Sequence, residues 1–297
     1  MTKETIFYVR NIYPNEVEQA ARVLHDAFYS NREHRYFSGT TFKAWGTPLL
    51  CSKKVTTRLQ FYLCNIRAVL LLDGQARIAV RSNRMSTKEG EEKEEILGVL
   101  LWLPPKKKIG MDHPLLLYQA GFSKIFCDWG YKGYKRIIKD WEDPNTIETK
   151  KLLTCKEVEE SGLIHMLGVD PIKQGQGVGT MLLQDLEALN LNIPTMLHAT
   201  ETKNRDFYAK MGYVVRGSWK TLSGIVDDDG LPVNRKRVNY EMESKEDTCY
   251  LMIKSALGEE EREVKYSSER ASVSIKNRST IDSNTFLVEL FAISRLK

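Results

Sequence analysis

The feature that most constrains the fold is a glycine-rich turn between a predicted strand and a predicted helix. Residues 163–169 form an apolar strand that ends at Asp170-Pro171, and a helix is predicted over residues 180–190. Glycines stand between them at 175, 177 and 179. Backbone N–H groups at such a turn point outward and, together with the helix dipole, bind anions, and glycine lets a diphosphate approach the main chain. The sequence therefore predicts an anion-binding turn inside a layered core.

Two other phosphate-binding loops compete for this signature. A P-loop requires Lys-Ser/Thr at its end, which the turn lacks, so that interpretation fails. A dinucleotide fingerprint that starts at Gly175 requires glycine where Thr180 stands, although Glu201 offers an acidic residue after the next strand. The dinucleotide interpretation is therefore weak but stays open.

The elements around the turn alternate between strand and helix, which predicts an α/β layered core. Further strands are predicted over residues 6–12, 76–81, 95–103, 194–199, 213–219 and 237–242, and helices over residues 17–28, 55–66 and 204–211. From residue 246 onward the pattern weakens, so we expect residues 246–297 to form a largely mobile extension outside the core.

The net charge of the chain is concentrated in one segment. The 297 residues carry 44 Lys+Arg and 39 Asp+Glu, a net charge of +5. Residues 104–141 hold eight bases and three acids, and eight minus three gives the same +5. A uniformly basic nucleic-acid binder is therefore a poor description, and we expect no nucleic-acid partner.

Aromatic residues follow helical spacing in the same segment. Tyr118, Phe122, Phe126 and Trp129 lie at positions i, i+4, i+8 and i+11, which places them on one face of a helix. Packing of this stripe against a sheet is the favoured interpretation. A mobile wall or lid of a substrate pocket is the alternative.

Cysteine usage and hydropathy indicate the compartment. The five cysteines are odd in number, widely spaced and without a C-x-x-C pair, so neither a disulfide framework nor a zinc site is expected. The amino-terminal residues lack the apolar run of a signal peptide, and residues 96–105 reach about half of the ~20 residues that a membrane helix needs. We expect a soluble cytoplasmic protein, with nuclear access open, no membrane partner and no bound metal.

Two blocks of sequence resemble motifs of the GNAT superfamily of N-acetyltransferases. Residues 169–179 resemble its acetyl-CoA motif, in which Gln174, Gly177 and Gly179 match position for position. Residues 197–200 and 207–213 resemble a later strand–helix motif, and residues 98–105 resemble a strand of members related to puromycin acetyltransferase. The resemblance implies an N-acetyltransferase domain over residues 4–245. It also implies a mixed, mainly antiparallel sheet that is flanked by helices and splayed at the acetyl-CoA strand.

The same resemblance assigns residues to acetyl-CoA, the implied co-substrate. The backbone N–H of Leu167 would hold the thioester carbonyl, Val169 would pair with pantetheine, and Gly168 lies between them. The turn would cradle the pyrophosphate through Gln174, Gly175, Gln176, Gly177, Val178, Gly179 and Thr180. Asn204 lies near an asparagine that contacts the cofactor in the family, although the spacing to Tyr208 points to Glu201 instead. No metal is implied.

Two residues carry the implied chemistry, in which a neutral amine attacks the thioester directly. Tyr208 matches the general acid of the family, and a phenol with a pKa of ~10 keeps its proton at pH 7. His165 lies two residues before Leu167, near a histidine that relays the amine proton in arylalkylamine acetyltransferases. A purely structural role for His165 is equally open.

The resemblance implies an acetyl-CoA-dependent N-acetyltransferase that acts on a primary amine. A non-catalytic acyl-CoA-binding module of the same fold and a nucleotide-binding oxidoreductase are the alternatives. The acceptor is either a small-molecule amine or a protein lysine, and the oligomeric state is left open. We hypothesise that lysines of residues 104–141 face an acidic acceptor or the phosphates of CoA.

Overall fold

The computed structural model describes residues 4–39, 53–84, 93–222, 225–227, 230–232 and 247–256. The chain divides into a unit of Met1–Ser255 and a C-terminal unit of Ala256–Lys297. All the features below belong to the first unit.

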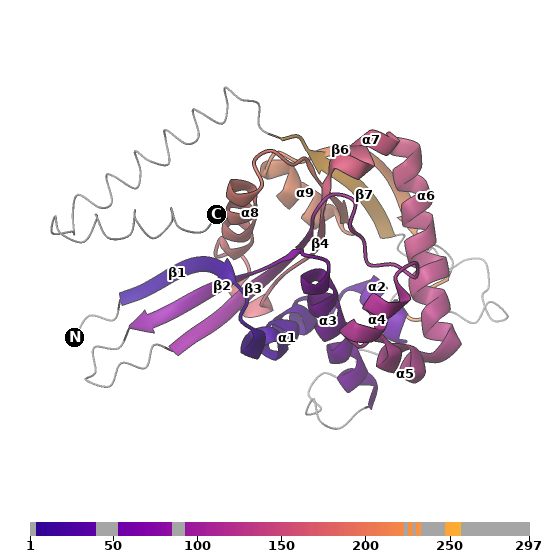
Figure 1. Ribbon diagram of the computed structural model, residues 1–297, viewed down its shortest axis with the longest axis horizontal. Coiled ribbons are helices and arrows are strands. Elements are labelled where there is room, and N and C mark those ends of the chain that lie inside the picture. The colour runs from indigo at the N-terminus through magenta and orange to yellow at the C-terminus, as the bar shows by residue number, and fades with distance from the viewer. Residues whose placement is uncertain are drawn as a thin grey trace. The chain divides into compact units, whose positions relative to one another are not determined.

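In the described part of the chain, seven strands form one mixed sheet in the order β1-β2-β3-β4-β5-β7-β6 (Figure 1). The strands are β1 (Glu4–Asn11), β2 (Gln75–Arg84), β3 (Lys93–Leu103), β4 (Gly162–Val169), β5 (Thr195–Ala199), β6 (Val214–Thr221) and β7 (Asp247–Lys254). The β4–β5 pair is parallel, and the other neighbouring pairs are antiparallel. This sheet, flanked by helices, confirms the predicted fold class.

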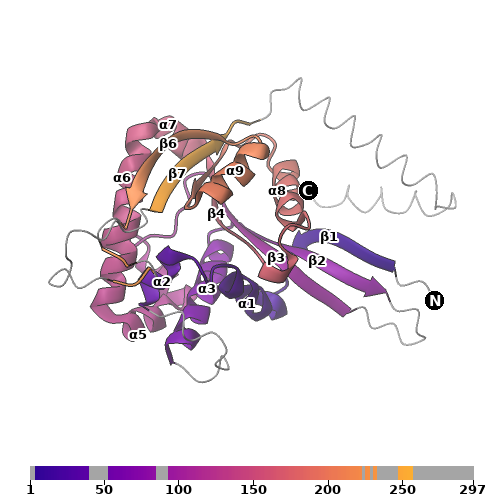
Figure 2. The ribbon, with the colours of Figure 1, turned by 180° about the vertical axis from the view of Figure 1, so that it is seen from behind.

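One face of the sheet is covered by helices from the first half of the chain (Figures 1 and 2). The helix α1 (Val17–Ala27) packs on β3 and β4, and α3 (Lys53–Leu71) packs on α1 and β2. The short helix α1 is amphipathic: Ala20, Ala21 and Leu24 are buried, whereas Glu18 and Arg22 form an exposed ion pair. Burial of this apolar stripe holds α1 against β4.

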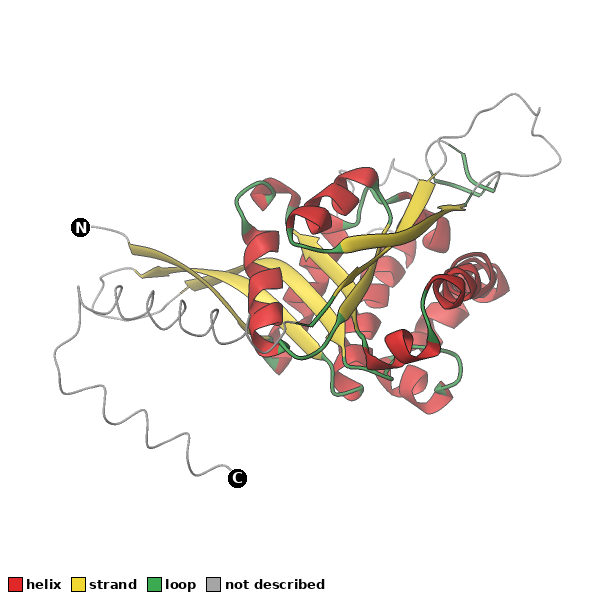
Figure 3. Cartoon of the chain, turned by 90° about the horizontal axis from the view of Figure 1, so that it is seen from above, coloured by secondary structure: helices red, strands yellow, loops and turns green. Residues whose placement is uncertain are grey.

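The opposite face is covered by α8 (Val178–Leu189), which contacts β1, β2, β3 and β4. Beside it, α9 (Thr202–Lys210) packs on β5, β6 and β7. Figure 3 shows the helices in red on both sides of the yellow strands. The predicted helices at the glycine turn and at residues 204–211 are thereby confirmed to within two residues at each end.

A helical insert connects β3 to β4. It consists of α4 (Pro114–Ala120), α5 (Phe122–Tyr134), the π-helix η3 (Lys135–Glu142), α6 (Asp143–Leu152) and α7 (Cys155–Glu160). The predicted aromatic stripe is interrupted because Gly121 has a φ of +95° and separates α4 from α5. Phe122, Phe126 and Trp129 do pack on the core, but mainly beside α3, where Phe61 contacts two of them, rather than against the sheet as the favoured interpretation has it. Tyr118 is 71% exposed.

β7 lies between β5 and β6, so the sheet continues past residue 245, where the sequence predicts that the domain ends. Cys249, Leu251 and Met252 of this strand are completely buried. The strand predicted over residues 237–242 lies outside the described residues, as do residues 257–297.

Candidate active site

The site begins where β4 and β5 separate. The two strands pair in parallel over three positions, and the last pair joins Ile164 to Leu197. From His165 onward, no described strand pairs with the β4 edge that faces β5, whereas the other edge stays paired with β3 as far as Val169. The predicted splay at this strand is therefore present, and it leaves backbone N–H and C=O groups of β4 available to a ligand.

His165 is the extra residue of a β-bulge at the point of separation. Met166 pairs with Leu101 and Ile164 pairs with Trp102, so His165 has no partner on β3. A bulge re-aims the side chain of its extra residue. Here the imidazole points to α3, where its Nε2 lies 2.7 Å from Oδ1 of Asn65.

Asn65 determines which nitrogen of the His165 ring carries the proton. The Nδ2 of Asn65 donates to the carbonyl of Phe61 at 2.8 Å, which fixes the orientation of the amide. Its Oδ1 can only accept, so Nε2 of His165 carries the proton and Nδ1 keeps its lone pair. Burial lowers the pKa of His165 to about 4, so the imidazole is neutral at pH 7.

A second histidine adjoins the first. His34 of α2 (Arg32–Ser38) stacks on Phe28 with ring centres 4.6 Å apart, and its Nδ1 lies 2.7 Å from the hydroxyl of Tyr62. Burial, followed by the charges of Arg58 and His165, holds the pKa of His34 well below its usual value. Burial raises the pKa of Tyr62 to about 12, so the phenol stays protonated and can donate a hydrogen bond to Nδ1 of His34.

Sequence reasoning missed His34, Tyr62 and Asn65. All three come from residues 31–65, where the apolar pattern is hard to interpret. The available signal was the cluster His34-Arg-Tyr-Phe37, an unusual density of rings around one histidine.

The structure places the predicted glycine turn at the start of α8, after the short helix η4 (Pro171–Lys173). Gly175 and Gly177 have φ values of +76° and +82°, and a Cβ at either position would meet nothing within 4 Å. Backbone conformation therefore requires glycine here, and the space above the turn is open. Gly177 is the N-cap of α8 and offers no side-chain cap, so the first N–H groups of the helix remain available for an anion.

The structure also places the five other residues that the sequence assigns to the cofactor in and beside the turn. The Nε2 of Gln174 donates to the carbonyl of Val169 at 3.2 Å and ties the turn to the end of β4. Val178 is buried in the core, so its backbone alone faces the turn. A Cβ on Gly168 would lie 2.9 Å from Leu24 of α1, which indicates that glycine there permits close helix–sheet packing. The exposed Gln176 donates to the carbonyl of Ile172 at 3.3 Å, and Thr180 lies in the first turn of α8.

The turn, β4 and α9 meet at Gly179. A Cβ at this position would lie 3.2 Å from the ring of Phe207 and 3.8 Å from the side chain of Leu167. The sequence assigned Gly179 to the approach of a diphosphate, whereas its contacts indicate close packing of α8 on α9. This packing sets the position of Tyr208, the next residue after Phe207.

Tyr208 is buried beside Tyr213, with ring centres 5.7 Å apart. Burial raises the pKa of Tyr208, so its hydroxyl is protonated at neutral pH. Asn204 lies four residues earlier and therefore on the same face of α9. Glu201 is the other residue that the sequence offers for this predicted cofactor contact, and its carboxylate forms an ion pair with Lys203 at 2.9 Å.

His198 lies on β5 at the position that corresponds to His165 on β4. Because Ile164 pairs with Leu197, His165 and His198 are the next residues on the two separating strands. The Nε2 of His198 lies 3.0 Å from the hydroxyl of Thr149 on α6, and burial lowers its pKa to about 4. Sequence reasoning gave no role to this histidine.

The described residues contain no group of three or more side chains placed to hold a metal ion. Within the same residues, no helix combines the length and apolar character needed to cross a membrane.

A comparison with curated proteins finds no match. Among solved structures, a "histone acetyltransferase HPA2 and related acetyltransferase" from Corynebacterium glutamicum is 16% identical with a TM-score of 0.46, over 87% of this chain and 98% of that one. Arylalkylamine N-acetyltransferase 2 from Aedes aegypti is 16% identical with a TM-score of 0.49, over 84% and 99%. The polyamine N-acetyltransferase of Drosophila melanogaster is 14% identical with a TM-score of 0.47, over 84% and 100%. Since all three scores lie below 0.5, no property of these proteins is carried over to this chain.

A family model gives the more specific result. The stretch from the end of η3 to the start of β6 contains the strand separation, His165, the glycine turn and Tyr208. That stretch, residues 141–215, matches the model described as "Acetyltransferase (GNAT) domain".

Proposed function

We propose that the chain is an acetyl-CoA-dependent N-acetyltransferase that transfers an acetyl group to a primary amine. The observation that carries this proposal is the free edge of β4, with an open glycine turn at one end and two neutral histidines at the other. The match of residues 141–215 to an acetyltransferase model supports the same reaction class.

The cofactor is proposed to bind along this free edge. The open space above Gly175 and Gly177 and the uncapped start of α8 suit the pyrophosphate of acetyl-CoA. The N–H of Leu167 would stabilise the carbonyl oxygen of the thioester as negative charge develops on it, and Val169 would pair with the pantetheine amide. Gln174 acts on the shape of the turn through its bond to Val169.

His165 is the proposed acceptor of the amine proton. An alkylamine is mostly protonated at pH 7, so attack requires removal of a proton. The Nδ1 lone pair of His165 is not used in the hydrogen bond to Asn65, and the lowered pKa keeps the imidazole neutral, although it also makes the ring a weaker base than a free imidazole. The ammonium form first loses one proton to solvent. As the resulting neutral amine nitrogen bonds to the carbonyl carbon, the C–S bond breaks and a second proton passes from the nitrogen to His165, directly or through water.

Tyr208 is the proposed donor to the leaving sulfur. Its raised pKa keeps the hydroxyl protonated in the resting enzyme. Transfer of that proton to the thiolate yields free CoA, and exchange with solvent then removes the proton from His165 and restores the one on Tyr208. The buried or unpaired thiols of Cys64, Cys127, Cys155 and Cys249 suit a reducing compartment such as the cytoplasm, where acetyl-CoA is available.

Release of free CoA thiol in the presence of a panel of amines tests the proposal. The expected result is acceptor-dependent release that is lost in His165→Gln. If acetyl-CoA raises the melting temperature but no amine causes release, the chain is a non-catalytic acyl-CoA-binding module. Stabilisation by NAD(P) and not by CoA would instead support the dinucleotide interpretation.

A further inference from the structure

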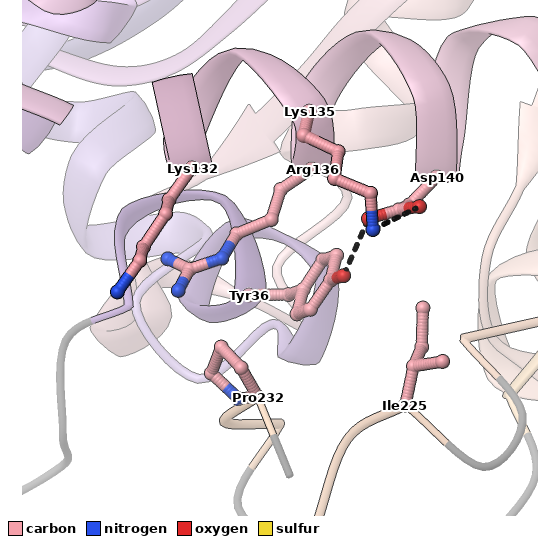
Figure 4. Close-up of a pocket in the computed structure, with 7 residues that line it drawn as sticks. All are labelled: Tyr36, Lys132, Lys135, Arg136, Asp140, Ile225 and Pro232. Carbon is pink, nitrogen blue, oxygen red and sulfur yellow. Dashed lines mark hydrogen bonds and ion pairs between the residues drawn. The ribbon is translucent and has the colours of Figure 1, made fainter. Parts of the chain in front are cut away.

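A basic pocket lies beside the helical insert (Figure 4), and no residue of the glycine turn lines it. Its volume is about 310 Å3, and it is formed by Tyr36 of α2, by Lys132 of α5 and by Lys135, Arg136 and Asp140 of η3. Ile225 and Pro232, from the connection that follows β6, form the remaining wall. Of the lysines of residues 104–141, Lys132 and Lys135 line this pocket, whereas the exposed Lys106, Lys107 and Lys108 do not.

The pocket holds three cations and one carboxylate, which gives a net charge of +2. Asp140 is already engaged, because it accepts from the Tyr36 hydroxyl at 2.7 Å and lies 3.6 Å from the ammonium of Lys135. Among the described residues, neither Lys132 nor Arg136 forms an ion pair, although Asp140 lies close enough to raise the pKa of Arg136. Within this part of the chain, the pocket therefore presents two positive charges without a paired carboxylate.

Arg136 is the better placed of these two charges. Its guanidinium lies over the Tyr36 ring, 5.6 Å from the ring centre, and is partly buried. Burial lowers the pKa of Arg136 from its ordinary value, and the nearby Tyr36 and Asp140 offset this effect only in part. A partly desolvated guanidinium that forms no ion pair among the described residues suits bidentate binding of an external carboxylate or phosphate.

Two backbone features hold Arg136 in this position. The π-helical turn η3 carries both Arg136 and Asp140, and π-helical turns are frequent at functional sites. Gly39 ends α2 with a φ of +62°, and a Cβ there would lie 2.6 Å from Nη1 of Arg136. Glycine at this helix end therefore makes room for the guanidinium as well as closing the helix.

The position of the pocket relates it to the acceptor rather than to CoA. α2 carries His34 beside His165 and, two residues later, Tyr36 in the pocket wall. A helix is about 10 Å wide, so the pocket lies on the order of 10 Å from the two histidines. The glycine turn leads instead into α8, which covers the opposite face of the sheet, and it contributes no residue to the pocket.

We propose that this pocket binds the anionic end, a carboxylate or a phosphate, of a small-molecule acceptor whose amine reacts beside His165. The inference rests on the proposed acetyl transfer. A volume of about 310 Å3 is at the lower end for small-molecule sites, which fits the end of a ligand rather than a folded partner. The recognition element is Arg136, assisted by Lys132.

The test compares acceptors and variants. Rates are measured with ω-amino carboxylates of increasing chain length, with ω-aminoalkyl phosphates and with uncharged alkylamines of matched length. Arg136→Gln should lower kcat/KM for the anionic acceptors roughly 10- to 100-fold, the range for loss of a hydrogen bond to a charged group. The same variant should leave the uncharged amines and the KM for acetyl-CoA unchanged, and the carboxylate and phosphate series identify the preferred anion.

A matched control and a conservative variant complete the design. Lys139 lies on the same π-helix but faces solvent in an ion pair with Asp143 at 2.9 Å, so Lys139→Gln should behave as the wild type. Arg136→Lys keeps the charge without the bidentate geometry and should retain part of the preference for anionic acceptors.

An equal loss for charged and uncharged acceptors, or a rise in KM for acetyl-CoA alone, would overturn the assignment of the pocket to the acceptor. If no amine causes CoA release, the proposed acetyl transfer fails, and calorimetric titration with the ω-amino carboxylate then decides the pocket separately. Binding that is lost in Arg136→Gln would support the anion site, whereas equal binding by both proteins would overturn it.

Discussion

At the scale of single residues, His165 takes its chemical character from Asn65 on α3. The amide fixes which imidazole nitrogen carries the proton, and the protein around the ring keeps it uncharged. A neutral amide accepts a hydrogen bond from Nε2–H without favouring the charged form of the imidazole, whereas a carboxylate in the same place would favour it. The identity of residue 65 should therefore set the pH range over which His165 can accept a proton.

Asn65→Asp should move the acid limb of the pH–rate profile upward. A carboxylate beside Nε2 favours the protonated imidazole, so the pKa of His165 rises from about 4. Because the base must be neutral, kcat/KM should fall at pH values where the wild type is still fully active. The profile of kcat/KM against pH, measured on both proteins, tests this.

Asn145→Asp is the matched comparison. Asn145 is also buried and accepts from Nε1 of Trp219 at 2.9 Å, so this variant likewise buries a new carboxylate. Its profile should keep the wild-type position. If Asn145→Asp shifts the profile and Asn65→Asp does not, the base is on the β5 side, where His198 contacts Trp219.

Tyr208→Phe should lower kcat about 100-fold and leave the affinity for acetyl-CoA unchanged, because loss of a general acid slows the chemical step. Tyr213→Phe is the control: its hydroxyl is buried in the same cluster and has no hydrogen-bond partner among the residues that the structure describes, so its removal should cost neither activity nor stability. Single-turnover rates and CoA titrations of both variants separate chemistry from binding. Full turnover by Tyr208→Phe would remove this residue from the mechanism.

At the scale of elements, the glycine turn owes its shape to φ values that other residues avoid. Gly177→Ala should cost about 1–2 kcal/mol for a left-handed conformation and should raise the KM for acetyl-CoA as the N–H groups are displaced. Gly130→Ala, in α5, also places a Cβ at positive φ in open space. Both variants should lose stability in urea, but the rise in KM should be confined to Gly177→Ala.

An unchanged KM in Gly177→Ala, with the expected loss of stability, would mean that the turn does not hold the cofactor. A rise of equal size in Gly130→Ala would assign the effect to general destabilisation.

Elements whose sequence pattern lies within one continuous segment of the chain could be predicted from the sequence. The strand, turn and helix over residues 163–190 were recovered because the apolar run, Asp170-Pro171 and the glycines are adjacent in the chain. The strand that carries Trp102 was recovered for the same reason, although its relation to the puromycin acetyltransferase branch stays a prediction. In the structure, the ring of Trp102 fills the space over Gly162, where a Cβ would lie 2.4 Å from it.

Features that depend on distant parts of the chain could not be predicted. β7 was missed because its burial arises from pairing with β5 and β6, which no local pattern reports. The bulge at His165 follows from register against β3, and the pairing of His165 with Asn65 joins residues 100 positions apart. The candidate cofactor turn was thus predictable from sequence, but the proton-accepting side of the site was not.

At the scale of the whole molecule, three histidines from α2, β4 and β5 are held uncharged by burial. In the unfolded chain each would bind a proton near pH 6.5. Between that pH and about 4, the unfolded state of His165 and His198 binds more protons than the folded state. Stability therefore rises with pH across this window and is lost as the pH falls through it.

The free energy of unfolding should consequently fall between pH 8 and pH 5, by about 2 kcal/mol for each of His165 and His198 at the lower pH. Urea unfolding at the two pH values measures the difference. His198→Gln removes one titrating ring and should reduce the difference in free energy of unfolding between the two pH values by about 2 kcal/mol. Tyr213→Phe changes no group that titrates in this range and should leave that difference unchanged. Equal stability of the wild type at pH 8 and pH 5 would show that the rings can charge without unfolding the core. In that case the neutral imidazole at the strand separation would no longer follow from burial, and the proton-accepting role of His165 would have to rest on its bond to Asn65 alone.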